Sequence, residues 1–556
     1  MREIFEIIRF SKEQNLNFNK NLFFTVLSSV IEVITLSTFI PLIYLIIDFE
    51  NVKLFFEKFD FFNFEYNTSF YKIIVLFVIL IFTFGTFLVF TIRYVVSNNL
   101  NKFSSYISYN IFRVYLENNY EEIISQKAAG IYNLISSETN RFCNGLVRSL
   151  FELLSRFFIF FFIVAGLLVY NFKITSVTII IGIVIYIIIY RFFKNFIGRY
   201  NENIDKITTH DNNFLRTGTQ AILELRVYSI AENFLNSFKG NLLKKNKFAL
   251  NLETIKQSPK YIIEVGLIVS FSILIFLDIN LINENLPKFA IYLVAFYKLF
   301  PTFNQFFNYY VSFKSHLKSV DAIKEILKKK KVIDKNIYFN QIKNIKLVDV
   351  NFKYKNDNKF ELKKFNLNIF EGDKVAIIGE TGSGKTTLLH MLMGLILPDK
   401  GNLIINENIN YDIKYLSSLI KNISYINQNP FFFEDTIAKN ICLKEELTEE
   451  EKERFEKIKK TILGIDFISK FSKGTNTILE TSGLNLSAGQ RQRINLARGI
   501  FKKHSIIFMD EPTSALDYDT ETKILDKLFK SDLITTSVIA THRKSILDYC
   551  NKVIEI

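Results

Sequence analysis

Cysteine is scarce in this chain of 556 residues, which contains only Cys143, Cys442 and Cys550. Their number is odd, they are far apart, and their spacing is not that of metal ligands. We therefore predict three ordinary reduced thiols.

A cleavable secretion signal and an internal repeat are also missing. Residues 1–20 carry four basic and three acidic side chains before the first apolar run, unlike the charged start and apolar centre of a signal peptide. An amphipathic helix lying on the cytoplasmic leaflet is predicted there instead. Its apolar face consists of Ile4, Phe5, Ile7, Ile8 and Phe10.

Long apolar runs are abundant in the first part of the chain. Residues 73–92 form a stretch of twenty residues without a charge, which is long enough for a helix to cross a hydrocarbon core of about 30 Å. Similar runs begin near Leu22, Phe151, Ile174, Ile262 and Phe289. We predict an all-α transmembrane domain of six helices with cytoplasmic coupling loops over residues 1–320, followed by a linker over 321–341.

The charge distribution predicts the orientation in the membrane. Residues 191–260 hold 12 basic and 6 acidic side chains, whereas residues 48–70 hold 2 and 5. The positive-inside tendency places the long basic segment and both termini in the cytoplasm. The net charge of +14 follows these cytoplasmic loops and the lysines of 328–331, so the predicted partner is anionic membrane lipid and not nucleic acid.

Residues 342–556 alternate short strands, glycine turns and charged helices, which predicts a soluble α/β domain. Near its start, an apolar strand at 374–378 enters a glycine-rich loop and a helix leaves it, as in a P-loop NTPase. Backbone N–H groups there would face phosphates, Lys385 would neutralise their charge and Thr386 would ligate Mg²⁺. The predicted ATP-binding residues are Gly379, Glu380, Thr381, Gly382, Ser383, Gly384, Lys385, Thr386 and Thr387.

Two carboxylates, Asp510 and Glu511, directly follow the apolar run 506–509. Buried carboxylates at a phosphate site are costly without a cation. We therefore predict that Asp510 holds Mg²⁺ and that Glu511 positions and polarises the attacking water.

The P-loop, the segment 486–490 and the segment 506–511 occur in the order that resembles the ATP-binding-cassette (ABC) superfamily. The resemblance covers essentially the whole chain and is to half-transporters of the exporter type, with six spans and one nucleotide domain. It implies that Tyr354 stacks on adenine, that Gln428 reaches Mg²⁺ and relays the nucleotide state, and that His542 contacts the terminal phosphate. A strand tyrosine, a loop glutamine and a lone histidine would otherwise be packing or structural residues.

The segment 486–490 opens a helix, whose first N–H groups and hydroxyl face an anion. In the family this anion is the ATP of a partner, so Ser487, Gly489 and Gln490 imply a homodimer with composite sites. Ala488 replaces the usual glycine, which costs little at a negative φ and roughly 1 kcal/mol or more at a positive φ. Glu480 is displaced by one position from the family's acid, and the candidate coupling segments are 130–134 and 220–228.

The cargo prediction depends on cations within the membrane spans. The chain resembles bacterial flippases of lipid-linked oligosaccharides in three features: Lys298 on span six, Lys260 at the start of span five and an outer amphipathic segment at 51–62. Those flippases have arginines at both lysine positions. An intramembrane cation suggests a functional site, and a pyrophosphate would need such partners. Arg93 would add to this substrate pocket or snorkel to the interface.

Structural alternatives stand beside these assignments. Lys260 and Glu264 are four residues apart, as are Glu152 and Arg156, and such pairs can simply stabilise one helix. Lys298 has no such neighbour on its own helix. Glu32 also has a counterpart in those flippases. Its two alternative roles are transport chemistry and a buried structural hydrogen bond.

We predict an ATP-hydrolysing homodimeric ABC exporter of a bacterial inner membrane that flips a lipid-linked oligosaccharide or related glycolipid. Export of drugs, peptides or simple lipids is the alternative. A nucleotide-sensing regulator without turnover is disfavoured by intact Glu511 and His542, and an importer by the fusion of both domains in one chain.

Overall fold

The computed structural model describes residues 2–40, 42–43, 68–118, 120, 128–277, 286–328, 339, 341–353, 361–380, 382–407, 409–480, 483–531 and 533–556. The chain forms two compact units. The first unit comprises Met1–Arg113 and Ala128–Lys328, and the second comprises Val114–Lys127 and Lys329–Ile556.

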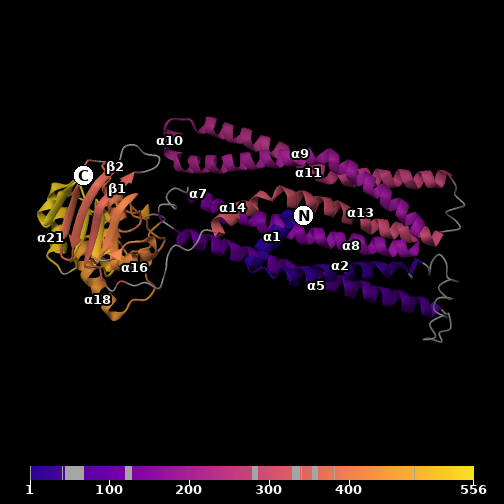
Figure 1. The fold of residues 1–556 in the computed structure, drawn as a ribbon, viewed down its shortest axis with the longest axis horizontal. Helices are drawn as coiled ribbons and strands as arrows, with labels where there is room; N and C mark the ends of the chain where they lie inside the picture. Colours follow the sequence, from indigo (N-terminus) through magenta and orange to yellow (C-terminus); the bar gives the residue numbers. More distant parts are fainter. Residues whose placement is uncertain are drawn as a thin grey trace. The chain divides into compact units, whose positions relative to one another are not determined.

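The first unit is helical (Figure 1). Its helices are α1 (Arg2–Glu13), α2 (Phe18–Ser37), α5 (Thr68–Leu116), α7 (Ala128–Asn133), the π-helices η1 (Leu134–Glu138) and η2 (Arg141–Val147), α8 (Arg148–Tyr170), α9 (Phe172–Gln220), α10 (Ile222–Val227), α11 (Ala231–Leu277), α13 (Leu286–Ser315) and α14 (Lys318–Leu327). Each of the six predicted apolar runs lies on a long helix, namely α2, α5, α8, α9, α11 or α13.

Three stretches of the described residues are long and apolar enough to cross a membrane: Phe18–Ser37, Lys72–Leu116 and Ile131–Tyr170. On α5, Phe84, Phe87 and Phe90 are largely exposed, as expected for side chains that face lipid. The other three predicted spans include side chains outside the described part of the chain, so their membrane crossing stays a prediction.

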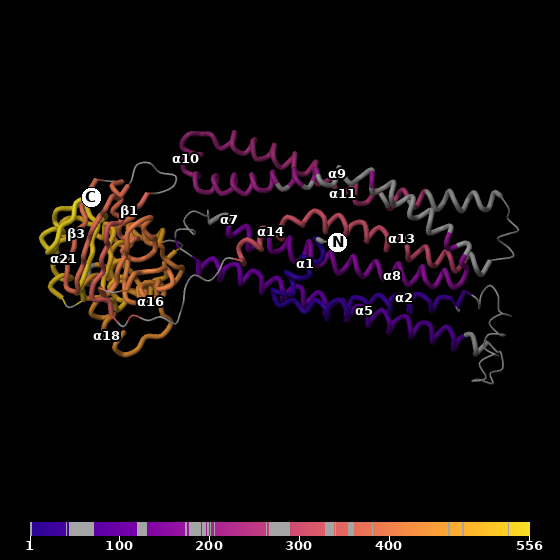
Figure 2. Tube along the Cα trace, viewed as in Figure 1, coloured from indigo at the N-terminus to yellow at the C-terminus, as the bar shows by residue number. Residues whose placement is uncertain are grey.

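Helix α8 packs against both α2 and α13, and α9 packs along α11 with α10 at their turn (Figure 2). The hydroxyls of Ser29 on α2 and Ser155 on α8 lie 3.0 Å apart, and such small polar residues let two membrane helices approach closely. Ile159 of α8 and Ile291 of α13 belong to one apolar cluster.

The N-terminal helix α1 only partly fits the prediction of a helix that lies on the leaflet. Phe5 is exposed, but Ile7 and Phe10 are buried within the unit. The Phe10 ring lies 5.7 Å from the Phe142 ring of η2. The sequence shows an apolar face, but it does not show which partner covers that face.

The second unit contains nine strands among its described residues: β1 (Asn344–Lys353), β2 (Glu361–Phe370), β3 (Lys374–Ile378), β4 (Lys400–Ile405), β5 (Ile409–Asn410), β6 (Ile423–Ile426), β7 (Ile506–Asp510), β8 (Ser537–Ala540) and β9 (Lys552–Glu555). Its α-helices are α15 (Lys385–Leu392), α16 (Leu416–Asn422), α17 (Ile437–Cys442), α18 (Glu449–Ile458), α19 (Gly464–Ile468), α20 (Ala488–Phe501) and α21 (Tyr518–Phe529). An antiparallel sheet has the order β2-β1-β4-β5, and a parallel sheet has the order β6-β7-β8-β3-β9.

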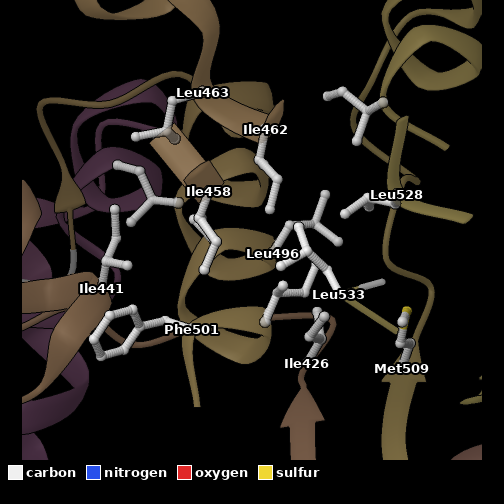
Figure 3. Close-up of a cluster of buried hydrophobic side chains, with 14 of the residues drawn as sticks. Ile426, Ile441, Ile458, Ile462, Leu463, Leu496, Phe501, Met509, Leu528 and Leu533 are labelled. Atoms are coloured by element: carbon white, nitrogen blue, oxygen red, sulfur yellow. The ribbon is translucent and has the colours of Figure 1, made fainter. Parts of the chain in front are cut away.

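The parallel sheet is buried on both faces, which explains its continuous apolar runs. Met509 and Ile539 contribute to one core cluster, whereas the alternate residues Phe508 and Val538 contribute to the other. The first cluster gathers side chains from several helices around the ends of β6 and β7 (Figure 3). The predicted fold class, an all-α membrane domain followed by an α/β P-loop domain, is confirmed.

The strand order decides where the loops meet. Strands β6, β7, β8 and β3 are consecutive and parallel, so their carboxyl ends lie at one edge of the sheet, where α/β proteins bind ligands. Gln428, Glu511, His542 and the P-loop each follow one of these four strands.

Candidate nucleotide site and membrane charge cluster

The P-loop connects β3 to α15. It needs glycine where the backbone φ is positive and where there is no room for a side chain. Gly384 precedes α15 with a φ of 96°, which strains any other residue. Gly379 has no room for a side chain, because a Cβ would lie 2.3 Å from the carbonyl oxygen of Ile556. The Lys385 ammonium donates to the carbonyl oxygens of Gly379 and Glu380, each at 2.8 Å. These bonds hold the positive charge inside the loop.

Thr386 and Asp510 meet next to the P-loop. The Thr386 hydroxyl donates to Asp510 Oδ2 at 2.7 Å. Burial raises the pKa of the Asp510 carboxyl above its ordinary value, while the Thr386 hydroxyl opposes this shift. A buried carboxylate beside a hydroxyl provides the oxygen ligands that Mg²⁺ prefers. These two residues therefore fit a magnesium ion.

The predicted catalytic residues Gln428 and His542 both contact the carboxylate of the third, Glu511. Gln428 Nε2 donates to Glu511 Oε2 at 2.8 Å, and His542 Nδ1 lies 3.0 Å from Glu511 Oε1. Glu511 itself has a φ of 47°, and such strained backbone is frequent at functional sites. Both carboxylate oxygens are thereby held in place, which is what a group that orients water requires.

Gln492 on α20 was not predicted from the sequence. It is buried, and its amide nitrogen donates to the Glu511 carbonyl at 2.9 Å and to the Ser514 hydroxyl at 3.2 Å. Its amide oxygen accepts from the Ala515 N–H at 2.7 Å. Gln492 therefore fixes the backbone on both sides of Pro512 and positions Glu511.

An ion pair between the buried Glu521 and the partly exposed Arg543 supports the same loop and was also missed. Arg543 Nη1 donates to Glu521 Oε2 at 2.6 Å, and Arg543 Nη2 donates to the Ser514 carbonyl at 2.7 Å. The Thr513 hydroxyl donates to Glu521 Oε1 at 2.6 Å. Since Glu521 and Arg543 lie 22 residues apart, no local pattern indicates this pair.

The segment 486–490 forms a capped helix start. Ser487 is the N-cap of α20: its hydroxyl accepts from the Gln490 N–H at 3.2 Å, and Gln490 Oε1 accepts from the Ser487 N–H at 2.8 Å. This reciprocal pair is a capping box. Ala488 is the first helical residue and is not among the residues with positive φ, so the condition under which alanine costs little is met.

Some of the remaining predicted residues lie within the part of the chain that the structure describes, and others lie outside it. Tyr354, Thr381 and the segment 51–62 lie outside the described residues. Gly382 has a φ of 90°, which only glycine adopts easily. The Glu480 N–H donates to Asn485 Oδ1 at 3.2 Å.

The two predicted coupling segments are helical. Segment 220–228 contains α10, whose Leu223 and Val227 are exposed, and segment 130–134 lies at the end of α7 and the start of η1. The sequence did not indicate Tyr120, which belongs to the second unit. Its ring lies 5.4 Å from the His390 ring of α15. This contact adjoins the P-loop helix.

A charge cluster lies within the first unit. Glu32 Oε2 accepts from Arg93 Nη2 at 2.6 Å, and Glu32 Oε1 lies 2.5 Å from Lys298 Nζ. Arg156 is 4.0 Å from Glu32 and 3.3 Å from Glu152. Lys298, without a partner on its own helix, thus finds one on α2. The predicted pairing of Glu152 with Arg156 is confirmed.

Lys260 has a different environment from Lys298. It lies 3.9 Å from Glu264 on the same helix, and both side chains are more than two fifths exposed. This is the intrahelical pair that the sequence offered as an alternative. Within the described part of the chain, the cluster joins Arg93 to Lys298 and does not include Lys260.

A cavity with both polar and apolar lining borders the cluster between α2, α5 and α8. Arg93 lies in its wall together with Arg148, whose Nη2 donates to Ser97 Oγ at 3.3 Å and to Asn101 Oδ1 at 3.0 Å. The other polar residues of the wall are Thr25, Ser28, Ser97, Glu152 and Ser155. Hydroxyls and guanidinium groups there would suit an anionic headgroup.

Comparisons with known proteins agree with this architecture. The ABC transporter family matches residues 362–514. An ATP-dependent lipid A-core flippase of Wigglesworthia glossinidia brevipalpis is 28% identical over 434 residues, which are 74% of this chain and 70% of that protein. An ATP-dependent lipid A-core flippase of Salmonella typhimurium is 33% identical over 241 residues, 42% of this chain and 39% of that protein.

Two further similarities concern a plant relative and the fold. ABC transporter B family member 29, chloroplastic, of Arabidopsis thaliana is 37% identical over 199 residues, 36% of this chain and 31% of that protein. The match therefore covers less than two fifths of the full length of the plant and Salmonella relatives. The structure of a bacterial Atm1-family ABC exporter with ATP bound has a TM-score of 0.77 and 17% identity, covering 98% of this chain and 94% of that one.

Fold and site together define an ABC ATPase domain fused to a helical, multi-pass membrane region. These findings support an exporter-type ABC half-transporter, in which an ATPase couples ATP hydrolysis to transport.

Proposed function

We propose that two copies of this chain form a homodimer that flips an anionic glycolipid across a bacterial inner membrane, using Mg²⁺ and ATP. The cargo that fits best is a lipid-linked oligosaccharide or a related glycolipid with a phosphorylated head. The observation that carries this proposal is the charge cluster of Arg93, Arg156 and Lys298 on membrane helices. The nucleotide domain and both termini would lie in the cytoplasm.

The charge balance of the cluster favours an anionic cargo. Three cations face two carboxylates, Glu32 and Glu152, which leaves one positive charge in excess. Charged groups inside a membrane are costly and mark substrate pathways. The relatives from Wigglesworthia and Salmonella are named lipid A-core flippases, which supports a lipid-based cargo over a drug or a peptide.

The hydrolytic step follows from the nucleotide site. The P-loop amides and Lys385 would hold the β- and γ-phosphates, and Thr386, Asp510 and Gln428 would hold Mg²⁺, which neutralises charge on the phosphate oxygens. Glu511 orients a water whose oxygen attacks the γ-phosphorus while the bond to the β-phosphate oxygen breaks. His542 holds Glu511 and would contact the γ-phosphate.

The homodimer follows from the incomplete site of one chain. Ser487, Gly489 and Gln490 begin a helix whose positive end attracts an anion, and the resemblance assigns them to the ATP of the partner chain. Two identical chains would then form two equivalent sites. Tyr354 would stack on adenine.

The test is the ATPase activity of the full-length chain in lipid nanodiscs, with and without an undecaprenyl-pyrophosphate oligosaccharide. We expect stimulation in the wild type, none in Glu511→Gln, and loss of stimulation in Lys298→Ala. Lys206→Ala is the matched control, because Lys206 forms an exposed intrahelical pair with Glu202 and should remain stimulated. Turnover indifferent to this lipid but raised by drugs or peptides would refute the proposal.

A further inference from the structure

Glu32 occupies the point where three membrane helices present cations. Arg93 comes from α5, Arg156 from α8 and Lys298 from α13. The two closest nitrogens lie 2.6 Å and 2.5 Å from different oxygens of the one carboxylate. The Glu32 side chain is 14% exposed. Glu32 thus contacts all three basic groups, while Glu152 on α8 is the closer partner of Arg156.

The arrangement around Glu32 is one that recognises oxyanions. A guanidinium fork and an ammonium point charge are the groups that proteins use for carboxylate and phosphate oxygens. Their positions are fixed by helices that pack on one another, α8 with both α2 and α13. A phosphate that replaced the carboxylate would therefore meet cations already in place, which lowers the cost of ordering them.

Donor atoms without a partner lie on Arg156, which faces Glu32, and on Arg148 in the cavity wall. Arg93 belongs both to the Glu32 pair and to the wall of the cavity. In that wall the Nη2 of Arg148 donates to the neutral Ser97 and Asn101 side chains. The Nε atoms of Arg148 and Arg156 are buried and have no hydrogen-bond partner among the described residues. Buried donors of this kind are costly unless a ligand satisfies them.

The helix that carries these arginines is irregular where it approaches the cavity. The π-helical segment η2 ends at Val147, and α8 begins at Arg148. The carbonyl oxygen of Gly145 accepts from the Ser149 hydroxyl at 2.5 Å and from the Ser312 hydroxyl of α13 at 3.2 Å. π-Helical turns are frequent at functional sites, and this one directly precedes Arg148.

We propose that Glu32 is a built-in competitor for the cargo. Its carboxylate pairs with Arg93 and Lys298 and lies 4.0 Å from Arg156, which Glu152 also holds, until a phosphate or pyrophosphate of a lipid headgroup displaces it into the adjoining cavity. This inference rests on the proposed anionic lipid cargo. It identifies the phosphate or pyrophosphate of the headgroup as the part of the cargo that the protein recognises. A lipid without a charged head would not displace Glu32, so the carboxylate also provides selection against neutral lipids.

The experiment measures binding of undecaprenyl pyrophosphate to the full-length chain in nanodiscs, with undecaprenol as the neutral probe. In Glu32→Gln the competing charge is gone while the side-chain shape remains. We expect undecaprenyl pyrophosphate to bind at least about fivefold tighter, the lower end of typical coupling between competing sites. Undecaprenol binding should stay as in the wild type. The matched control is Glu264→Gln, which removes the partner of Lys260 and should bind both probes as the wild type does.

Equal or weaker binding of undecaprenyl pyrophosphate by Glu32→Gln would overturn the inference and leave Glu32 as a structural ion pair or a direct ligand. A parallel gain for undecaprenol would overturn it as well, because the effect would not depend on charge. Absence of binding in both the wild type and Glu32→Gln would instead refute the anionic cargo itself.

Three cations without their carboxylate are a risk for folding, since unpaired buried charges are strongly destabilising. Glu32→Asp is the second variant, because it keeps the charge and shortens the reach of the carboxylate by one methylene. We expect this variant to bind undecaprenyl pyrophosphate tighter than the wild type and less tightly than Glu32→Gln. Wild-type or weaker affinity in a folded Glu32→Asp protein would contradict the proposal independently.

Discussion

Replacing Arg543 by alanine should destabilise the nucleotide domain by removing the partly exposed partner of a buried carboxylate. Glu521, whose side chain is 2% exposed, would lose the partner at 2.6 Å. The Ser514 carbonyl would lose its donor at 2.7 Å. Breaking a buried pair in this way costs about 3–5 kcal/mol, a large share of the about 5–15 kcal/mol that stabilises a typical domain.

This free energy translates into a measurable thermal shift. For a domain of about 200 residues, 1 kcal/mol corresponds to about 2–4 °C, so the Tm of the nucleotide domain should fall by roughly 6–20 °C. The assay is thermal unfolding of the full-length protein without nucleotide, followed by hydrogen exchange of peptides that cover residues 507–517. The amides of Ala515 and Leu516 should exchange faster, since Arg543 also donates to the Leu516 carbonyl.

Two comparisons test the reasoning. Lys530→Ala removes an exposed partner of Asp526, at 3.5 Å with the lysine 76% exposed, and should leave the Tm close to that of the wild type, because exposed ion pairs contribute little. The double variant Arg543→Met/Glu521→Leu removes both charges and should recover part of the loss, because the Thr513 hydroxyl and the Ser514 carbonyl still lose their partners. A Tm of Arg543→Ala within 2 °C of the wild type, with unchanged exchange at 515–516, would refute the assignment.

Three further predictions concern the nucleotide site and the thiols. Glu511→Gln should lower ATP turnover by about 10²–10⁴-fold, the usual contribution of a positioned base, while ATP binding measured by filter retention persists, because the P-loop contacts of Lys385 are unchanged. Asp510→Asn should abolish turnover yet raise the Tm at pH 7 without nucleotide. Burial raises the folded pKa of Asp510. The stability that the protonated carboxyl contributes is therefore present below the unfolded pKa and is lost as the pH rises through the folded pKa. Burial also raises the pKa of Cys550 to about 11, so maleimide labelling in the folded protein at pH 8 should be slower than in the unfolded protein, where the thiol pKa is about 8.5.

The outcomes that would contradict these three predictions are distinct. Turnover in Glu511→Gln within tenfold of the wild type would remove Glu511 from the role of base. The Tm gain of Asp510→Asn should shrink as the pH falls through the raised folded pKa of Asp510, because the wild-type carboxyl then takes up a proton. A gain that is constant with pH would point to a cause other than charge. Equal labelling rates of Cys550 in the folded and unfolded protein would show that burial does not protect the thiol.

The sequence by itself determined the local features. The P-loop is readable because strand, glycine loop and helix are adjacent in the chain, and the glycines answer steric demands of their own backbone, such as the φ of 96° at Gly384. The capping residue Ser487 and its partner Gln490 are three positions apart, within one helical turn. An uncharged run of twenty residues predicts a membrane helix through length alone.

Only the tertiary structure decided which distant residues meet. Gln428, Glu511 and His542 converge because β6, β7 and β8 are neighbours in the sheet, and strand order is not encoded in the apolar pattern of each strand. Glu32 and Lys298 pair across two helices although they are far apart in the sequence. A charged side chain inside a helical bundle takes whichever partner helix packing brings near, and packing depends on contacts between whole faces that no single segment contains.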